Sequence, residues 1–206
     1  KTPLVVATHN AGKVGELLTL LAPLGVTGVG AAGLGLHEPD ETEETFTGNA
    51  LLKASLAAAQ TGRVALADDS GVCVDALGGA PGIYTARWAG EPRDWKRAMK
   101  RVEFELADRG AALPSARGAS FVCALALAAP DGQYVTSEAR VPGVLVWPPR
   151  GDLGAGFEPM FVAQGQRLTY GEMQPEARHA INHRAAAFRM LVARLPDALE
   201  APPSAP

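Results

Sequence analysis

Residues 3–13 read PLVVATHNAGK, and this stretch decides the fold class. Its first five residues are an apolar run that predicts a short buried strand, and residues 8–12 predict a loop. Val14, Leu17, Leu18 and Leu21 then recur at helical spacing, so we expect a helix that begins near Lys13. A strand, a tight loop and a helix in this order are typical of the opening of an α/β sheet.

The loop after the first predicted strand has the residues of an anion site. Thr8, Asn10 and Lys13 lie where the strand ends and the helix begins, which is where α/β sheets bind ligands. A hydroxyl, an amide, an ammonium and free backbone N–H groups there would all donate to an anion. The loop is not a Walker A motif, because G-x-x-x-x-G-K is absent. A plain strand–helix turn with Asn10 as the cap explains the same residues equally well.

A second helix is predicted from the cap residue Thr45 to about Gln60, after an acidic loop at residues 38–44. It places Asn49 and Lys53 on one face, four positions apart. Small alanines surround Lys53, which indicates that this face lies close to another part of the molecule. Taken alone, however, Lys53 is read as an ordinary solvated lysine.

The most acidic feature after a buried segment is the run Asp68-Asp69-Ser70-Gly71, which we interpret as a turn that follows a strand at residues 64–67. Two neighbouring carboxylates repel each other, and such a pair is commonly kept ionised by a cation. Hard oxygen ligands favour Mg²⁺ over zinc, and Mg²⁺ held by carboxylates and phosphates is usual in phosphoryl transfer. A surface turn would explain the residue types but not their place after a buried strand, so a metal site is the favoured interpretation.

The rest of the chain continues the α/β pattern. Residues 72–77 are expected to be extended, residues 93–108 helical with a basic, solvated outer face, and residues 119–128 and 134–146 two strands joined as a hairpin. A short apolar run follows at residues 160–162. The last helix is expected to open at His183-Arg184, a pair that is more often surface decoration than a site, and its core stripe is Ile181, Phe188, Leu191, Val192 and Leu195.

One motif is rejected. Residues 28–33 read GVGAAG and match the dinucleotide fingerprint G-x-G-x-x-G, but the residues after them cannot form the helix that would hold a pyrophosphate. We interpret this segment as a flexible connection.

Composition limits the classes of function. The chain has 206 residues, a length that fits one domain over residues 1–195. Its net charge of −3 excludes a general nucleic-acid surface. The Ala/Pro-rich residues 196–206 are expected to be a disordered tail. The longest apolar run, residues 121–130, is too short to span a membrane. Cys73 and Cys123 lie in apolar runs without metal-site spacing, so we expect buried free thiols and a reduced, cytoplasmic location.

Residues 66–90 read LADDSGVCVDALGGAPGIYTARWAG, a long and highly punctuated string. Together with the T-x-N-x-x-K loop, the T-F-x-x-N-A-x-x-K-A helix at residues 45–54 and the late His183-Arg184 pair, it resembles the inosine/xanthosine triphosphate pyrophosphatase family. The resemblance runs from about Leu4 to Val192.

The resemblance implies an elongated, two-lobed α/β domain with a central mixed sheet flanked by helices, a cleft between the lobes, and a homodimer. It implies a house-cleaning enzyme that hydrolyses ITP, dITP and XTP to a monophosphate and pyrophosphate with Mg²⁺, or with Mn²⁺ in its place. Its carried-over roles are phosphate binding by Thr8, Asn10 and Lys13, charge neutralisation by Lys53, metal binding by Glu41 and Asp69, and support from Asp68 and Ser70. Asp69 would also orient or deprotonate the attacking water.

The departures from the family lie mainly in the part that should recognise the base. Residues 154–159 read GAGFEP where the family reads GFGYDP, so Ala155 replaces a stacking aromatic and Glu158 replaces a base-reading aspartate. Phe157 stands at the second aromatic position and is our candidate for stacking instead. Arg178 stands where the family usually has a lysine before the last helix, and Asn182-His183-Arg184 stands where it has S-H-R. In the second helix, Gly48 replaces the family's usual glutamate.

Three hypotheses therefore stay open. The chain is an inosine/xanthosine nucleotide pyrophosphatase whose substrate contacts include Ser70, Phe157, Glu158, Arg178, His183 and Arg184. Alternatively it runs the same reaction with a broadened or shifted base preference, or it is a catalytically weak nucleotide-binding paralogue. Retention of Glu41, Lys53, Asp68 and Asp69 argues against the last hypothesis.

Overall fold

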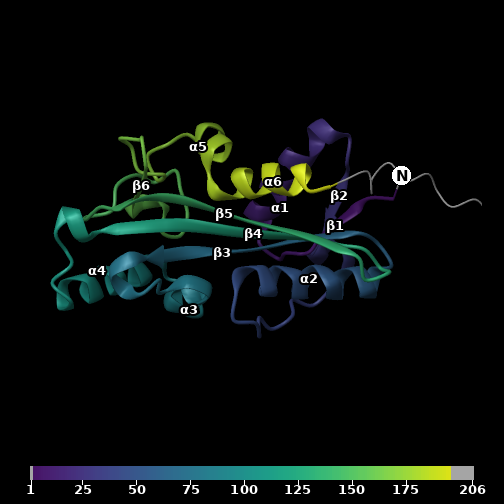
Figure 1. Ribbon diagram of the computed structural model, residues 1–206, viewed down its shortest axis with the longest axis horizontal. Helices are drawn as coiled ribbons and strands as arrows, with labels where there is room; N and C mark the ends of the chain where they lie inside the picture. The colour runs from purple at the N-terminus through teal and green to yellow at the C-terminus, as the bar shows by residue number, and fades with distance from the viewer. Residues whose placement is uncertain (1, 196–206) are drawn as a thin grey trace, which may run out of the picture.

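A computed structural model describes residues 2–195, and the predicted tail at residues 196–206 lies outside the described residues. Figure 1 shows an elongated molecule built on one long sheet with helices on both faces. The strands are β1 (Leu4–Val6), β2 (Gly28–Gly30), β3 (Ala65–Val74), β4 (Gly118–Ala128), β5 (Tyr134–Leu145) and β6 (Phe161–Ala163). The helices are α1 (Ala11–Leu21), α2 (Phe46–Thr61), α3 (Thr85–Ala89), α4 (Trp95–Asp108), α5 (Pro175–Ile181) and α6 (His183–Ala193).

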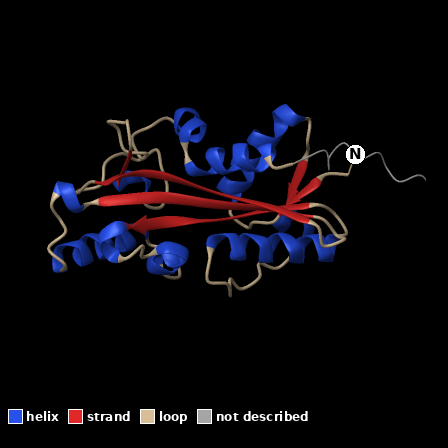
Figure 2. Cartoon of the chain, viewed as in Figure 1, coloured by secondary structure: helices blue, strands red, loops and turns tan. Residues whose placement is uncertain are grey.

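The sheet is mixed, with the strand order β2-β1-β3-β4-β5-β6. β1 pairs in parallel with β2 and β3, whereas β3, β4, β5 and β6 pair antiparallel. The expected mixed α/β fold is confirmed. The long β4–β5 hairpin, visible as the two longest arrows in Figure 2, carries the sheet through the length of the molecule.

Three apolar clusters fill the space around the sheet. One lies between α1, α6 and one face of the sheet, and includes Leu17, Leu66, Leu125 and Leu191. A second lies under α2 on the opposite face and is rich in alanine, which lets the helix approach β3 and β4 closely. The third lies between α4, the β6 end of the sheet and the loops around it. No helix among residues 2–195 is long and apolar enough to cross a bilayer.

The acidic run is part of a strand, so our interpretation of it as a turn is wrong. β4 pairs with every residue from Ala65 to Val74, and this ladder keeps the backbone extended through Asp68 and Asp69. β1, by contrast, pairs with β3 only at Ala65 and Leu66. Beyond Leu66, β3 has no paired strand on its β1 side among the described residues, and the carboxyl end of β1 is where a ligand site is expected in an α/β sheet.

Two smaller predictions also need correction. Residues 28–33 are not a flexible connection, because Gly28–Gly30 forms the edge strand β2 and Ala31–Leu34 a short 3-10 helix. The last helix, α6, begins at His183 as predicted, but Ile181 belongs to the preceding helix α5. Asn182 follows α5 and caps α6 by accepting a hydrogen bond from the backbone N–H of Ala185. Ile181 therefore lies outside the core stripe and is 38% exposed.

Candidate active site

Asp68 lies on the α1/α6 face of β3, in a buried ion network. Its Oδ2 is 3.0 Å from Lys13 Nζ and 3.2 Å from Arg184 Nη2. Burial alone would raise the pKa of Asp68, but the Lys13 ammonium and the Arg184 guanidinium hold it below its ordinary value. Arg184 also donates to Ser70 Oγ at 3.1 Å. The side chains predicted at residues 13, 68, 70 and 184 therefore do meet, although they come from α1, β3 and α6.

Asp69 points to the opposite face, because successive strand residues alternate. It lies under α2 with Glu41 and Lys53, and Lys53 Nζ is 3.2 Å from Glu41 Oε2. Burial and the neighbouring Glu41 carboxylate raise the pKa of Asp69 to about 7. Burial opposes the charge of Lys53, yet the carboxylates of Asp68, Glu41 and Asp69 raise its pKa. Asp69 and Glu41, rather than the two aspartates, are thus the mutually repelling pair.

This carboxylate pair is suited to a cation. Asp69 Oδ2 is buried and has no hydrogen-bond partner among the described residues. No group of three or more His, Cys, Asp or Glu side chains within residues 2–195 is placed to form a complete protein cage for a metal. Two carboxylates with free positions are what Mg²⁺ uses when phosphate oxygens and water complete its shell, so Glu41 and Asp69 fit that ion.

The loop between β1 and α1 forms the expected cap and leaves donors near its helix N-terminus. Asn10 Oδ1 accepts from the Lys13 N–H at 3.1 Å, and Thr8 Oγ1 accepts from the Asn10 N–H at 3.2 Å. The structure therefore has the capped turn that the sequence left as one alternative. Because Lys13 on this turn also reaches Asp68, the cap and the phosphate-binding hypothesis are compatible.

The base-recognition candidates cluster around Arg178. Its Nε lies 2.7 Å from Glu158 Oε2, and its Nη1 donates to the carbonyl oxygens of Leu153, Tyr170 and Met173. Burial raises the pKa of Glu158 to about 7 despite the Arg178 guanidinium. Phe157 is only 3% exposed and packs edge to face against Trp95 at 5.9 Å between ring centroids. In this arrangement its ring is covered, and base stacking by Phe157 stays a prediction that requires this loop to move.

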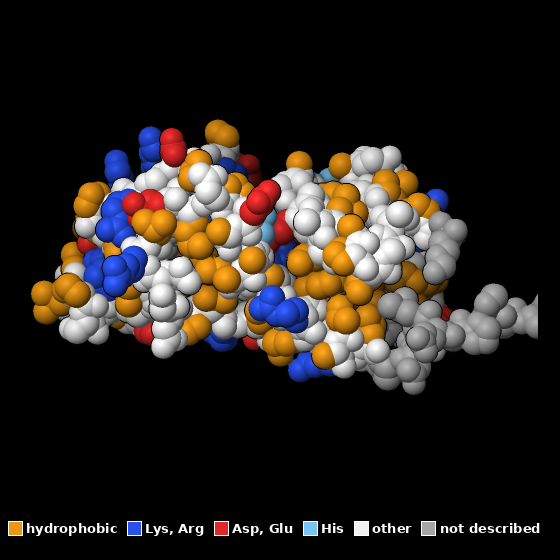
Figure 3. Space-filling view, turned by 90° about the horizontal axis from the view of Figure 1, so that it is seen from above, with side chains coloured by type: hydrophobic (Ala, Val, Ile, Leu, Met, Phe, Trp, Pro, Cys, Tyr) orange, Lys and Arg blue, Asp and Glu red, His pale blue; other side chains and the backbone are white. Residues whose placement is uncertain are grey.

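His183 begins α6 and lies close to the charged side chains of the Asp68 network. Burial and the nearby cations Arg184 and Lys13 lower its pKa well below the ordinary value, so the neutral imidazole is favoured. Its Nδ1 is buried without a hydrogen-bond partner among the described residues, which leaves a polar atom for a ligand. On the face of the molecule seen in Figure 3, charged side chains of both signs and a histidine side chain lie close together near the narrow middle.

Glu16 is the member of the network that the sequence analysis missed. Its carboxylate accepts from Arg184 Nη1 at 2.8 Å and from Asn182 Nδ2 at 2.6 Å, and so ties α1 to the start of α6. The available signal was its position three residues after Lys13, which places both side chains on one face of α1.

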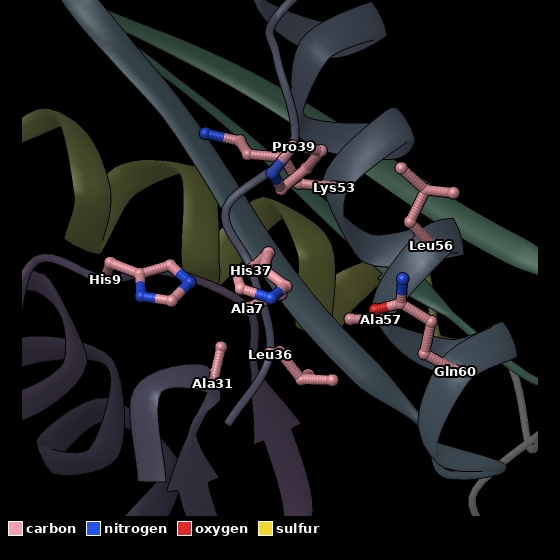
Figure 4. Close-up of a pocket in the computed structure, with 10 residues that line it drawn as sticks. All are labelled: Ala7, His9, Ala31, Leu36, His37, Pro39, Lys53, Leu56, Ala57 and Gln60. Carbon is pink, nitrogen blue, oxygen red and sulfur yellow. The ribbon is translucent and has the colours of Figure 1, made fainter. Parts of the chain in front are cut away.

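Beside Lys53, a small cavity opens between α2 and the loop that precedes it (Figure 4). His9 and His37 come to it from two different loops, while the Lys53 ammonium points away from Leu56 and Gln60. Its volume of about 30 Å³ holds a water molecule or two rather than a purine. In this arrangement the cavity beside Lys53 is too small for a purine.

Comparison with known proteins identifies the family of the chain. A model of the Ham1 family matches residues 4–194. The dITP/XTP pyrophosphatase of Zymomonas mobilis is 53% identical over 190 residues, covering 92% of this chain and 90% of its own. That of Caulobacter vibrioides is 54% identical over 195 residues, covering 94% and 98%.

Solved structures give the same result. A HAM1 protein from Coxiella burnetii superimposes with a TM-score of 0.85 at 32% identity, covering 94% of this chain and 98% of its own. A nucleoside-triphosphatase / dITP/XTP pyrophosphatase from Mycobacterium abscessus has a TM-score of 0.75 at 37% identity, covering 95% and 100%.

Proposed function

Because this chain belongs to the Ham1 family, we propose that it is a nucleoside triphosphate pyrophosphatase that hydrolyses dITP, ITP and XTP to a monophosphate and pyrophosphate. The observation that carries the proposal is the division of charge across β3. On one face, the carboxylate of Asp68 is balanced by the cations Lys13 and Arg184. On the other face, the two carboxylates of Glu41 and Asp69 share the single ammonium of Lys53.

The chain's own residues account for positioning and charge, which are the main requirements of phosphoryl transfer. Lys13, the free N–H groups at the start of α1 and Lys53 would compensate the charge that develops on the leaving pyrophosphate. Asp69 would orient the attacking water and accept its proton at Oδ2, the buried atom that lacks a partner among the described residues. Asp68 would hold Lys13 and Arg184 in place.

Glu41 and Asp69 would hold Mg²⁺, with Mn²⁺ as the alternative metal. When bound, the ion would neutralise the repelling carboxylates and withdraw charge from the phosphates. We also propose a homodimer on the basis of the family resemblance. Cys73 and Cys123 are both free and buried, which supports a reducing compartment.

For base preference we propose inosine and xanthosine nucleotides, as the names of the relatives indicate. The alternative of a broadened preference has a specific support. Ala155 offers no ring and the Phe157 ring is covered, so stacking on the base would be weaker by about 1–3 kcal/mol than with an exposed aromatic.

Pyrophosphate release tests the function. With Mg²⁺ present, ITP, dITP and XTP should be hydrolysed faster than the eight standard NTPs and dNTPs, and the products should be the monophosphate and pyrophosphate. Equal rates for all substrates would favour the broadened preference, and nucleotide binding without turnover would favour the weak paralogue. Asp69→Asn should lower kcat by at least about 100-fold, since a proton acceptor contributes about 10²–10⁴-fold. An active Asp69→Asn enzyme would remove Asp69 from its role.

A further inference from the structure

The acidic loop that carries Glu41 is fastened to α2 by a buried side chain to which no role has been given so far. Asn49 is 1% exposed. Its Oδ1 accepts from the Glu43 N–H at 3.0 Å, and its Nδ2 donates to the Glu43 carbonyl oxygen at 3.4 Å. One amide thus binds both backbone groups of a single loop residue, two positions after Glu41.

This attachment is the main backbone restraint on the loop. Among the described residues, the backbone of residues 37–44 makes hydrogen bonds at two positions, Glu41 and Glu43. The bond at Glu41 joins its carbonyl oxygen to Arg87 Nη2 at 3.5 Å and is exposed, so it is weak. The two bonds to Asn49 are partly buried, and leaving this amide unpaired would cost free energy.

Gly48, the residue before Asn49 in α2, also allows the loop at Glu43 to lie close to the helix. A Cβ added at Gly48 would lie 2.9 Å from Thr45 Oγ1 and 3.0 Å from Glu43 Cβ, closer than side chains normally pack. The absence of a side chain at Gly48 therefore lets Glu43 lie against the first turn of α2, where Asn49 binds it.

We propose that Asn49 is a positioning residue for the metal site. By holding Glu43 on α2 it sets the place of the Glu41 carboxylate opposite Asp69 and Lys53 before any metal binds. The inference rests on the proposed function for its consequence in catalysis, but not for the attachment itself. Partners that orient a metal ligand without touching the metal typically contribute about 10–100-fold to metal affinity.

The test uses the full chain with Asn49→Ala and, as a matched control, Thr47→Ala. Thr47 lies in the same turn of α2 but donates to Glu138 on β5, away from the loop. In the metal-free protein, amide hydrogen exchange at Glu43 and its loop neighbours should be about tenfold faster in Asn49→Ala than in the wild type. The Mg²⁺ concentration for half-maximal ITP hydrolysis should rise by about tenfold, with kcat at saturating Mg²⁺ changed by less than about threefold.

A second variant acts from the loop side in case Asn49→Ala does not fold. Glu43→Pro removes the N–H that Asn49 accepts and lies outside α2, whose cap is Thr45. It should raise the Mg²⁺ requirement to the same extent as Asn49→Ala. The proposal is overturned if the folded variants match Thr47→Ala in loop exchange and Mg²⁺ requirement. A wild-type protein that does not cleave ITP would instead refute the proposed function, while the exchange experiment would still report on the attachment.

Discussion

Asp68 and Asp69 are adjacent residues with opposite electrostatic situations. Asp68 is surrounded by Lys13 and Arg184, and its ionised form is strongly favoured. Asp69 shares its side of β3 with Glu41, and its ionised form is disfavoured. One carboxylate therefore stabilises the metal-free fold, and the other is held there at a cost that a cation would relieve.

The two aspartates should accordingly differ in their effect on stability. Asp68→Asn should lower the free energy of unfolding by about 3 kcal/mol, because it leaves buried Arg184 with less compensation. Asp69→Asn should leave that free energy unchanged or raise it, because it removes the repulsion with Glu41. Urea unfolding of the metal-free variants at pH 7.5 measures both. A loss in Asp69→Asn as large as that in Asp68→Asn would show that the charges are not divided in this way.

At the scale of elements, the sequence predicts best where a pattern is local. The first strand, the capped α1 and α2, and the β4–β5 hairpin are all confirmed, since apolar spacing and capping residues specify them. The acidic run was misread because its extended backbone depends on pairing with β4, which lies far along the chain. The prediction of a flexible connection at residues 28–33 is wrong for the same reason, because Gly28–Gly30 becomes a strand only by pairing with β1.

The contact of β3 with the segment before α3 gives a prediction for an element. At Gly71 an added Cβ would lie 2.6 Å from Thr85 Oγ1 and closer still to the Gly82 carbonyl oxygen. Gly71→Ala should therefore destabilise the protein by about 1–3 kcal/mol and disturb Asp69 nearby. Gly15→Ala is the control, because a Cβ there meets nothing within 4 Å. In the helix α1 the same substitution should stabilise by about 0.5–1 kcal/mol, and thermal unfolding distinguishes the signs.

At the scale of the whole molecule, the site candidates are distributed along the sheet. The phosphate-binding candidates lie in or just before α1 and in α2, on the β1 side of the centre, and Glu158 and Arg178 belong to the segments around β6 and α5 on the other side (Figure 1). Sequence order predicted the members of each group, through the resemblance. Arg184 of α6 is one of those predicted members, but its pairing with Asp68 and Glu16 could not be predicted, because those contacts depend on how α6 packs across α1 and β3.

A nucleotide that reaches both groups should bind far better than either of its parts. Linking two contacts makes the second one intramolecular, so its entropy cost is largely met by the first. With Mg²⁺, an α,β-methylene analogue of ITP at about 100 times its Kd should stabilise the fold by about 2.7 kcal/mol. IMP and pyrophosphate, added together at that concentration, should shift the Tm much less. Equal shifts would mean that the phosphate and base candidates do not act on one ligand, and the base would then have to be sought away from Glu158 and Arg178.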